Sequence, residues 1–173
     1  VAAAALAAGA SILNDVTASP EMLPLVARHD AMLVLMHLRG TPRTMQHDTR
    51  YADVVAEVTE FLAARAAVAR DRGIPRDRVW LDPGVGFGKD TDGNLRLLAH
   101  LPDLAALGHP VVVGASRKSF IGSLSGAGVD DRLGGSLAAL TPLARLPRAV
   151  ARVHDVAATV HFLRVQAAIA DAA

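Results

Sequence analysis

Short apolar runs alternate along the chain with longer stretches in which apolar residues recur every three or four positions. The runs are rich in Val, Leu and Ile and end on polar residues or glycine, which is typical of buried parallel strands. The longer stretches are typical of helices that bury one face. The pattern predicts five strands, at residues 11–13, 31–36, 79–81, 111–113 and 150–153.

Helices are predicted between these strands. The clearest covers residues 51–72, where a stripe of apolar side chains ends at Gly73. Because strand and helix alternate five times, and each connection can cross over to a parallel neighbour, the sequence predicts an α/β fold. No linker divides the chain, so residues 1–173 are predicted to form a single domain. The other helices are expected at residues 1–8, 24–28, 92–107, 133–145 and 156–172, with a glycine-rich connection at 122–128.

The third strand leads into the most distinctive stretch of the chain, which from residue 79 reads VWLDPGVGFGK. The strand ends on Asp82, and the glycines that follow would let the backbone approach a ligand closely, with Phe87 between them as a stacking face. In parallel α/β folds ligands bind beyond the carboxyl ends of the strands, where Asp82 would lie. An ordinary turn, in which Asp82 caps the next helix, is the alternative that this stretch leaves open.

The glycine-rich loop does not match either of two nucleotide-binding motifs. A phosphate-binding P-loop needs glycine where Pro83 stands and a hydroxyl side chain where Asp90 stands. The dinucleotide-binding fingerprint needs a third glycine where Lys89 stands. The loop is therefore assigned to neither class of site.

The composition of the chain limits the kinds of ligand and partner that it is expected to bind. The chain has 173 residues, of which 51% are hydrophobic, and a net charge of +1, so it can bury a substantial core but lacks the basic excess that favours nucleic acid. The absence of cysteine excludes disulfides and thiolate metal sites and agrees with a cytoplasmic location. We expect neither a signal peptide nor a membrane span. The seven histidines show no metal-ligand spacing, so no metal ligand is predicted.

Polar residues gather at the carboxyl ends of the predicted strands. In a parallel barrel those ends surround one mouth, so the recurrence predicts a site there, although a single polar residue at a strand end is more often structural. We interpret His37 as a packed group rather than a ligand. The residues at the strand ends are Asn14, His37, Asp82, Ser116, Arg117, Lys118, Arg152 and His154.

Five ordered motifs resemble the signatures of the dihydropteroate synthase family. This resemblance covers essentially the whole chain and implies a TIM (β/α)8 barrel of the pterin-binding type, here a partial barrel with about five βα units. The family condenses 6-hydroxymethyl-7,8-dihydropterin pyrophosphate with p-aminobenzoate to 7,8-dihydropteroate and pyrophosphate in folate biosynthesis. Sulfonamides act on these enzymes as competitors of the substrates. The motifs are SILNDV from residue 11, VLMHLRGTPRTMQ from 34, LDPGVGFGK from 81, VGASRKSFIG from 113 and RVHDV from 152.

The resemblance also implies roles for individual residues. Asn14 and Asp82 would bind the edge of the pterin, and Lys118 would reach its carbonyl and ring nitrogen. A carboxylate can accept both N–H groups of the guanidine-like pterin edge, which would compensate a buried Asp82. The pocket would be lined by Met36, Phe87 and Gly114.

The remaining roles concern the leaving group and the second substrate. Arg152 would lie against the pterin ring and, with His154, face the pyrophosphate, while Ser119 would lie near p-aminobenzoate. Asp82, Lys118, Arg152 and His154 are the expected catalytic residues. We expect pyrophosphate to leave first, so that a carbocation-like pterin is attacked by the aniline nitrogen without an obligatory general base, with Mg²⁺ as Lewis acid.

The chain departs from the family pattern in two places. It opens on Val1 within a helical pattern and supplies five βα units instead of about eight, so we expect an N-terminal part with three strands to be missing and the fragment alone to be inactive. Pro142 and Pro147 interrupt a helix that is usually continuous, so we expect this helix to be kinked or shortened. A homodimer through the late helices is expected from the family, but these prolines weaken the expectation.

Two other functions remain open at this point. A pterin-binding methyltetrahydrofolate methyltransferase would share the Asn and Asp on the pterin, but its chemistry does not call for the cations of SRKSFIG and RVHD. A non-catalytic barrel fragment, which keeps the pocket only as scaffold, is the alternative from a different class. Retention of the polar residues at the strand ends argues against it.

Overall fold

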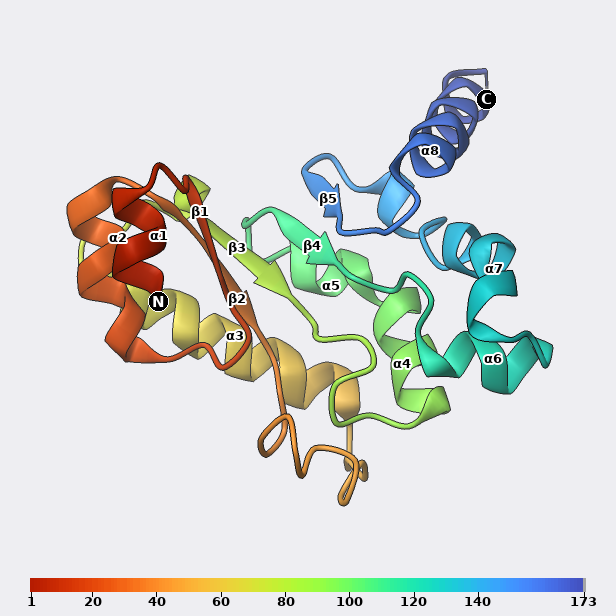
Figure 1. Cartoon of the computed structure of the whole chain (residues 1–173), viewed down its shortest axis with the longest axis horizontal. Coiled ribbons are helices and arrows are strands. Elements are labelled where there is room, and N and C mark those ends of the chain that lie inside the picture. Colours follow the sequence, from red (N-terminus) through yellow and green to blue (C-terminus); the bar gives the residue numbers. More distant parts are fainter. Residues whose placement is uncertain (173) are drawn as a thin grey trace.

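The computed structural model describes residues 1–172 and contains five parallel strands whose spatial order repeats their order in the chain, β1-β2-β3-β4-β5 (Figure 1). The register pairs Met36 at the end of β2 with Asp82 at the end of β3. The predicted α/β fold and all five predicted strands are thus confirmed, with no bound shifted by more than two residues. The strands are β1 (Ile12–Asp15), β2 (Met32–Met36), β3 (Val79–Asp82), β4 (Val111–Val113) and β5 (Ala149–Ala151).

Helices connect and flank these strands. Short 3-10 turns lie at Pro20–Met22, Arg76–Arg78, Val129–Asp131 and Leu143–Arg145. Within residues 1–172, no helix is both long enough and apolar enough to traverse a lipid bilayer. The helices are α1 (Ala2–Ala7), α2 (Leu23–His29), α3 (Val54–Asp71), α4 (Thr91–Ala99), α5 (Leu101–Ala105), α6 (Ser119–Ser125), α7 (Leu133–Ala138) and α8 (Val156–Asp171).

Three helices differ from the sequence prediction. The single helix expected at residues 92–107 is divided into α4 and α5, because Pro102 can occupy the first turn of a helix but not its interior. Helix α6 was not predicted, since glycines mask its pattern, and it ends where Gly126 adopts a left-handed conformation. Helix α7 stops at Ala138, before Pro142, so the expected shortening is confirmed.

The sheet has two unlike faces, since successive strand residues point to opposite sides. On one face, side chains such as Leu33, Leu81 and Val113 are fully buried in a core that includes side chains from α2 to α6. The other face borders a hollow of about 550 Å³, which side chains of α8 also line. Sheet residues along this hollow include Ile12, Asn14, Val34, Trp80, Val112, Val150 and the neighbouring Arg152. The hollow lies on the same face of the sheet as Asn14 and Arg152, two of the predicted site residues.

Candidate active site

A buried carboxylate stands at the carboxyl end of the central strand. Asp82 is only 1% exposed; its Oδ1 accepts a hydrogen bond from the Gly84 N–H at 2.7 Å, and its Oδ2 lies 3.4 Å from Nη2 of Arg152. Burial raises the pKa of Asp82, while the Gly84 N–H and the Arg152 guanidinium oppose the shift. A carboxylate offers about four acceptor positions, so Asp82 keeps capacity for donors from a ligand.

A lysine and a phenylalanine from different loops meet beside this carboxylate. The ammonium of Lys118, which follows β4, lies 3.8 Å from the centre of the Phe87 ring in the glycine-rich loop. Burial and the nearby Arg152 lower the pKa of Lys118, and Asp82 opposes the shift. The contact is a cation–π interaction, which positions the ammonium over an aromatic face.

Arg152, just beyond β5, completes the group through contact with Gly114. A Cβ atom added to Gly114 would lie 2.6 Å from Nη2 of Arg152, so the guanidinium occupies the space that a side chain would fill. The Arg152 side chain is half exposed, and it covers Asp82 from the solvent side through its 3.4 Å contact. Glycine at residue 114 is thus what allows Arg152 to approach the buried carboxylate.

The loops after β4 and β5 are tied together by two polar contacts. His154 Nδ1 lies 2.9 Å from the hydroxyl of the buried Ser116. Arg117 donates two hydrogen bonds from Nη2 to the carboxylate of Asp155, at 2.9 and 3.2 Å, and a third from Nε at 3.2 Å. Bidentate pairs of this kind fix orientation as well as distance. They hold His154 in place relative to β4.

The other predicted residues lie around this group at different depths. Met36 is fully buried at the end of β2, beside Asp82 in the register. Asn14 is exposed on the sheet face that lines the hollow, which Arg152 also lines. Ser119 is exposed at the start of α6. The structure therefore brings Asp82, Lys118, Phe87, Gly114 and Arg152 together directly, and leaves Asn14, Ser119 and His154 at the margin.

His37 is packed, in agreement with its interpretation from the sequence. It is 7% exposed, its ring meets the Phe61 ring edge-on with centroids 5.0 Å apart, and its Nδ1 lies 3.0 Å from Nζ of Lys89. Burial, with the positive charge of Lys89, lowers the pKa of His37 to about 3. The ring is therefore neutral in the folded protein.

Comparison with known proteins decides the family. Residues 1–154 match the family model described as "Pterin binding enzyme". The chain belongs to the pterin-binding enzyme family.

Individual relatives of this family are named dihydropteroate synthase. The chain is 41% identical over 173 residues to that of Synechocystis sp., covering 98% of this chain and 60% of the relative. It is 44% identical over 168 residues to that of Neisseria meningitidis serogroup B, covering 93% and 59%. The chain thus spans about 60% of the length of these curated relatives.

Solved structures of pterin-binding enzymes have the same fold. The dihydropteroate synthase of Thermus thermophilus in complex with 6HMPPP superimposes with a TM-score of 0.91 at 47% identity, covering 97% of this chain and 68% of that one. The Yersinia pestis enzyme in a sulfonamide drug complex gives 0.92 at 34% identity, covering 98% and 62%. The predicted fold, part of a pterin-binding TIM barrel, is confirmed.

The sequence did not single out Lys89, Asn94 or Asp155 as contributors to this candidate site. Lys89 and Asn94 are buried beneath the glycine-rich loop, where Asn94 Oδ1 accepts the Gly86 N–H at 2.6 Å. Asp155 lies in the RVHDV motif, which was the signal available for it. Lys89 contacts His37 after β2, and Asp155 contacts Arg117 after β4, so periodicity along the chain could not identify these two partners. The partners of Asn94 lie in the loop that precedes α4, where the glycines give no periodic pattern.

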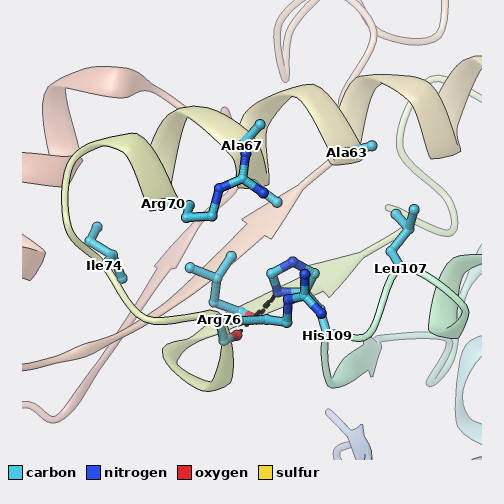
Figure 2. Close-up of a pocket in the computed structure, with 9 residues that line it drawn as sticks. Ala63, Ala67, Arg70, Ile74, Arg76, Leu107 and His109 are labelled. Carbon is cyan, nitrogen blue, oxygen red and sulfur yellow. Dashed lines mark hydrogen bonds between the residues drawn. The ribbon is translucent and has the colours of Figure 1, made fainter.

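A second cavity lies at the opposite end of the sheet. It encloses about 170 Å³ next to α3 and the start of β3, with Arg70, Arg76 and His109 among its lining residues (Figure 2). The His109 Nδ1 contacts two carbonyl oxygens, those of Arg76 at 3.1 Å and Val79 at 2.9 Å, so this nitrogen carries the proton. Val79 and Asp82 are the two ends of β3, so this cavity is separate from the candidate site around Asp82.

We expect His37 to make the stability of the protein sensitive to acid. Its pKa is lower in the folded than in the unfolded chain, so the unfolded state binds more protons as the pH falls from about 6.5 to about 3. The stability contribution is present above 6.5 and is lost over this window, by about 4 to 5 kcal/mol. Urea unfolding between pH 7 and pH 4 should show a shallower pH dependence for His37→Gln than for the wild type. The exposed His47→Gln variant is the control, and identical slopes for all three proteins would contradict the assignment.

Proposed function

We propose that this chain carries the greater part of the active site of a dihydropteroate synthase. The observation that carries the proposal is the under-compensated carboxylate of Asp82, buried at a strand end with Arg152 and Lys118 around it. Support comes from relatives of that name and from solved relatives in complex with 6HMPPP, with 4-aminobenzoate and with 7,8-dihydropteroate. No observation favours the methyltransferase or the non-catalytic alternative.

Pterin would be bound at its guanidine-like edge. Asp82 can accept a pair of N–H donors because, within residues 1–172, only Gly84 and Arg152 donate to its carboxylate oxygens. Arg152 is half exposed and can move aside to lie along the ring, with Met36 at the floor. Asn14 would add a side-chain amide from the sheet face that lines the hollow. Lys118 would donate to the pterin carbonyl and ring nitrogen.

The proposed reaction exchanges one bond for another at the exocyclic methylene of the pterin. The C–O bond to pyrophosphate breaks, and pyrophosphate leaves with the electron pair. The lone pair of the p-aminobenzoate nitrogen then forms the C–N bond, and the nitrogen loses a proton to solvent. Arg152 and His154 would stabilise the charge on the leaving pyrophosphate, while the carboxylate of Asp82 favours the cationic pterin. Phe87 would line the pterin pocket, and Ser119 would lie near the p-aminobenzoate.

Magnesium remains part of the proposal only through the substrate. Residues 1–172 contain no group of three or more His, Cys, Asp or Glu side chains placed to hold a metal ion. Pyrophosphate oxygens are ligands that Mg²⁺ prefers, so the ion would be held mainly by the substrate and would supply Lewis-acid stabilisation of its charge.

The oligomeric state and domain organisation belong to the same proposal. Residues 1–173 would form one domain that pairs as a homodimer through α7 and α8. Helix α8 exposes apolar side chains, including Val156, Val165 and Ile169, which supports a covering partner. A cytoplasmic location stays a prediction from composition.

Lys118→Ala should weaken pterin binding by about 10- to 100-fold, because a charge-assisted hydrogen bond contributes roughly 1.5 to 3 kcal/mol. Calorimetric titration with a pterin that lacks pyrophosphate measures this directly. The matched control is Arg145→Ala, which removes a cation at the opposite end of the sheet and should leave affinity unchanged. Equal affinity of wild type and Lys118→Ala would contradict the assignment. Pyrophosphate release by the full-length natural protein tests the complete reaction.

A further inference from the structure

Lys89 is a buried lysine that the proposed chemistry does not use. It closes the loop of residues 83–89 and is 3% exposed. Figure 1 shows this loop between β3 and α4. Its ammonium donates to the carbonyl oxygens of Gly84 at 3.0 Å and Phe87 at 2.9 Å, and lies 3.0 Å from Nδ1 of His37. A longer fourth contact, at 3.4 Å, reaches the carbonyl oxygen of His37.

The protonated ammonium matches this environment. It has three N–H donors, and three acceptors lie within 3.0 Å of it, one of them the neutral His37 ring. The four partners found within residues 1–172 are all uncharged, so the site is not an ordinary ion pair. Burial lowers the pKa of Lys89 to about 7, opposed by Asp82 and reinforced by Arg39 and Lys118.

The two carbonyls that Lys89 holds belong to the two residues that set the geometry of the site. The Gly84 N–H donates to Asp82 Oδ1 at 2.7 Å. The Phe87 ring lies 3.8 Å from the ammonium of Lys118. Contacts therefore run from Lys89 through Gly84 to the carboxylate of Asp82, and from Lys89 through Phe87 to the ammonium of Lys118.

We propose that Lys89 is a positioning residue that holds the loop of residues 83–89 against the end of β2, and thereby sets Asp82 and Phe87 for pterin binding. It touches no substrate itself. Its effect on the ligand passes through Gly84 and Phe87, whose carbonyl groups are restrained in position while the ammonium donates a hydrogen bond to each. This inference rests on the proposed pterin site, but the holding of the loop can be measured without a ligand.

The test compares Lys89→Met with the wild type by two measurements. Methionine has nearly the same length and no donors, so the loop carbonyls lose their partner. Amide hydrogen exchange in residues 83–89 should become at least about tenfold faster, and the Kd for a pterin without pyrophosphate should rise about tenfold or more. The stability control is Leu104→Ala in the core, which should lower the melting temperature without changing exchange in the loop or the Kd.

A rescue separates positioning from a general loss of packing. The chain contains no cysteine, so Lys89→Cys carries a single thiol. In denaturant, its thiolate displaces bromide from 2-bromoethylamine, forming a C–S bond and a side chain of lysine length with a terminal ammonium. After refolding, this protein should recover slow loop exchange and wild-type affinity, and wild type taken through the same treatment is the control.

Each outcome decides between the two proposals. Unchanged loop exchange in Lys89→Met, or faster exchange with unchanged Kd, would overturn the positioning role. Failure of the refolded ammonium side chain to restore exchange would also overturn it. If the wild type binds no pterin, the proposed function fails for this chain. The rate of amide exchange in residues 83–89 then tests by itself whether Lys89 holds the loop in place.

Discussion

Asp82→Asn should raise the Kd for pterin by at least about 100-fold, the largest effect on binding that we expect from one substitution. The asparagine keeps the shape and can still accept the Gly84 N–H, but its NH₂ group would face the N–H donors of the pterin edge. The site loses one hydrogen-bond acceptor, and the NH₂ donor of the asparagine is placed against an N–H donor of the pterin. The favourable charge toward a cationic pterin is lost as well.

The same substitution should leave the fold at least as stable as before. Burial raises the pKa of Asp82, which means that the folded state disfavours its charge. For a carboxyl group with a raised folded pKa, stability falls as the pH rises above the unfolded value, so at neutral pH the charge costs folding free energy. Asparagine removes this cost. Binding should therefore fall while the melting temperature stays equal or rises.

Calorimetry and thermal unfolding on the same samples check both halves of this expectation. Asp77→Asn, exposed at the opposite end of β3, is the matched control and should change neither quantity. Near-normal pterin affinity of Asp82→Asn would remove Asp82 from its role. A large fall in melting temperature would show that the carboxylate is structural instead.

Gly84→Ala should destabilise the protein by about 4 kcal/mol or more, which lowers the melting temperature by roughly 10 °C. Gly84 has φ +70°, and a Cβ there would overlap the carbonyl oxygen of His37 and lie 3.1 Å from its carbonyl carbon. The neighbouring backbone cannot shift freely, because the His37 N–H donates to the Asp82 carbonyl at 3.0 Å. The substitution would separate the ends of β2 and β3.

Gly73→Ala is the control for this effect. Gly73 has a similar φ of +83°, but a Cβ there would have nothing within 4 Å. Only the cost of the left-handed backbone remains, about 1 kcal/mol. Thermal unfolding of both variants measures the difference, and equal losses would show that backbone conformation, rather than the contact with His37, explains the requirement for glycine.

The sheet and the placement of the site could be predicted because both follow from order along the chain. Each apolar run is followed by polar residues or glycine, and parallel pairing necessarily brings those ends to one edge of the sheet. Asp82, Lys118 and Arg152 could thus be assigned to one site without any knowledge of their distances.

The contacts within the site could not be predicted in this way. Lys89 binds His37, which lies 52 positions earlier, and a lysine after a glycine-rich loop has the sequence appearance of a solvent-exposed cation. The approach of Arg152 to Gly114 depends on the register of β5 against β4. Such contacts depend on tertiary packing, whereas sequence patterns report mainly on local structure.

The order of the strands bears on how the chain could be divided. Within residues 1–172, each strand pairs only with the strands that precede and follow it in the sequence, so the two pieces made by a cut in one connection share a single strand pairing. A cut between β2 and β3, in the segment of residues 37–53 before α3, would leave β1 with β2 and β3 with β4 and β5. Two separately expressed pieces would need to re-form the β2–β3 pairing and the packing of α3 against β2, and the end of that pairing carries Asp82 and His37. Ligand-dependent reassembly of such halves would make the protein a split sensor for pterins.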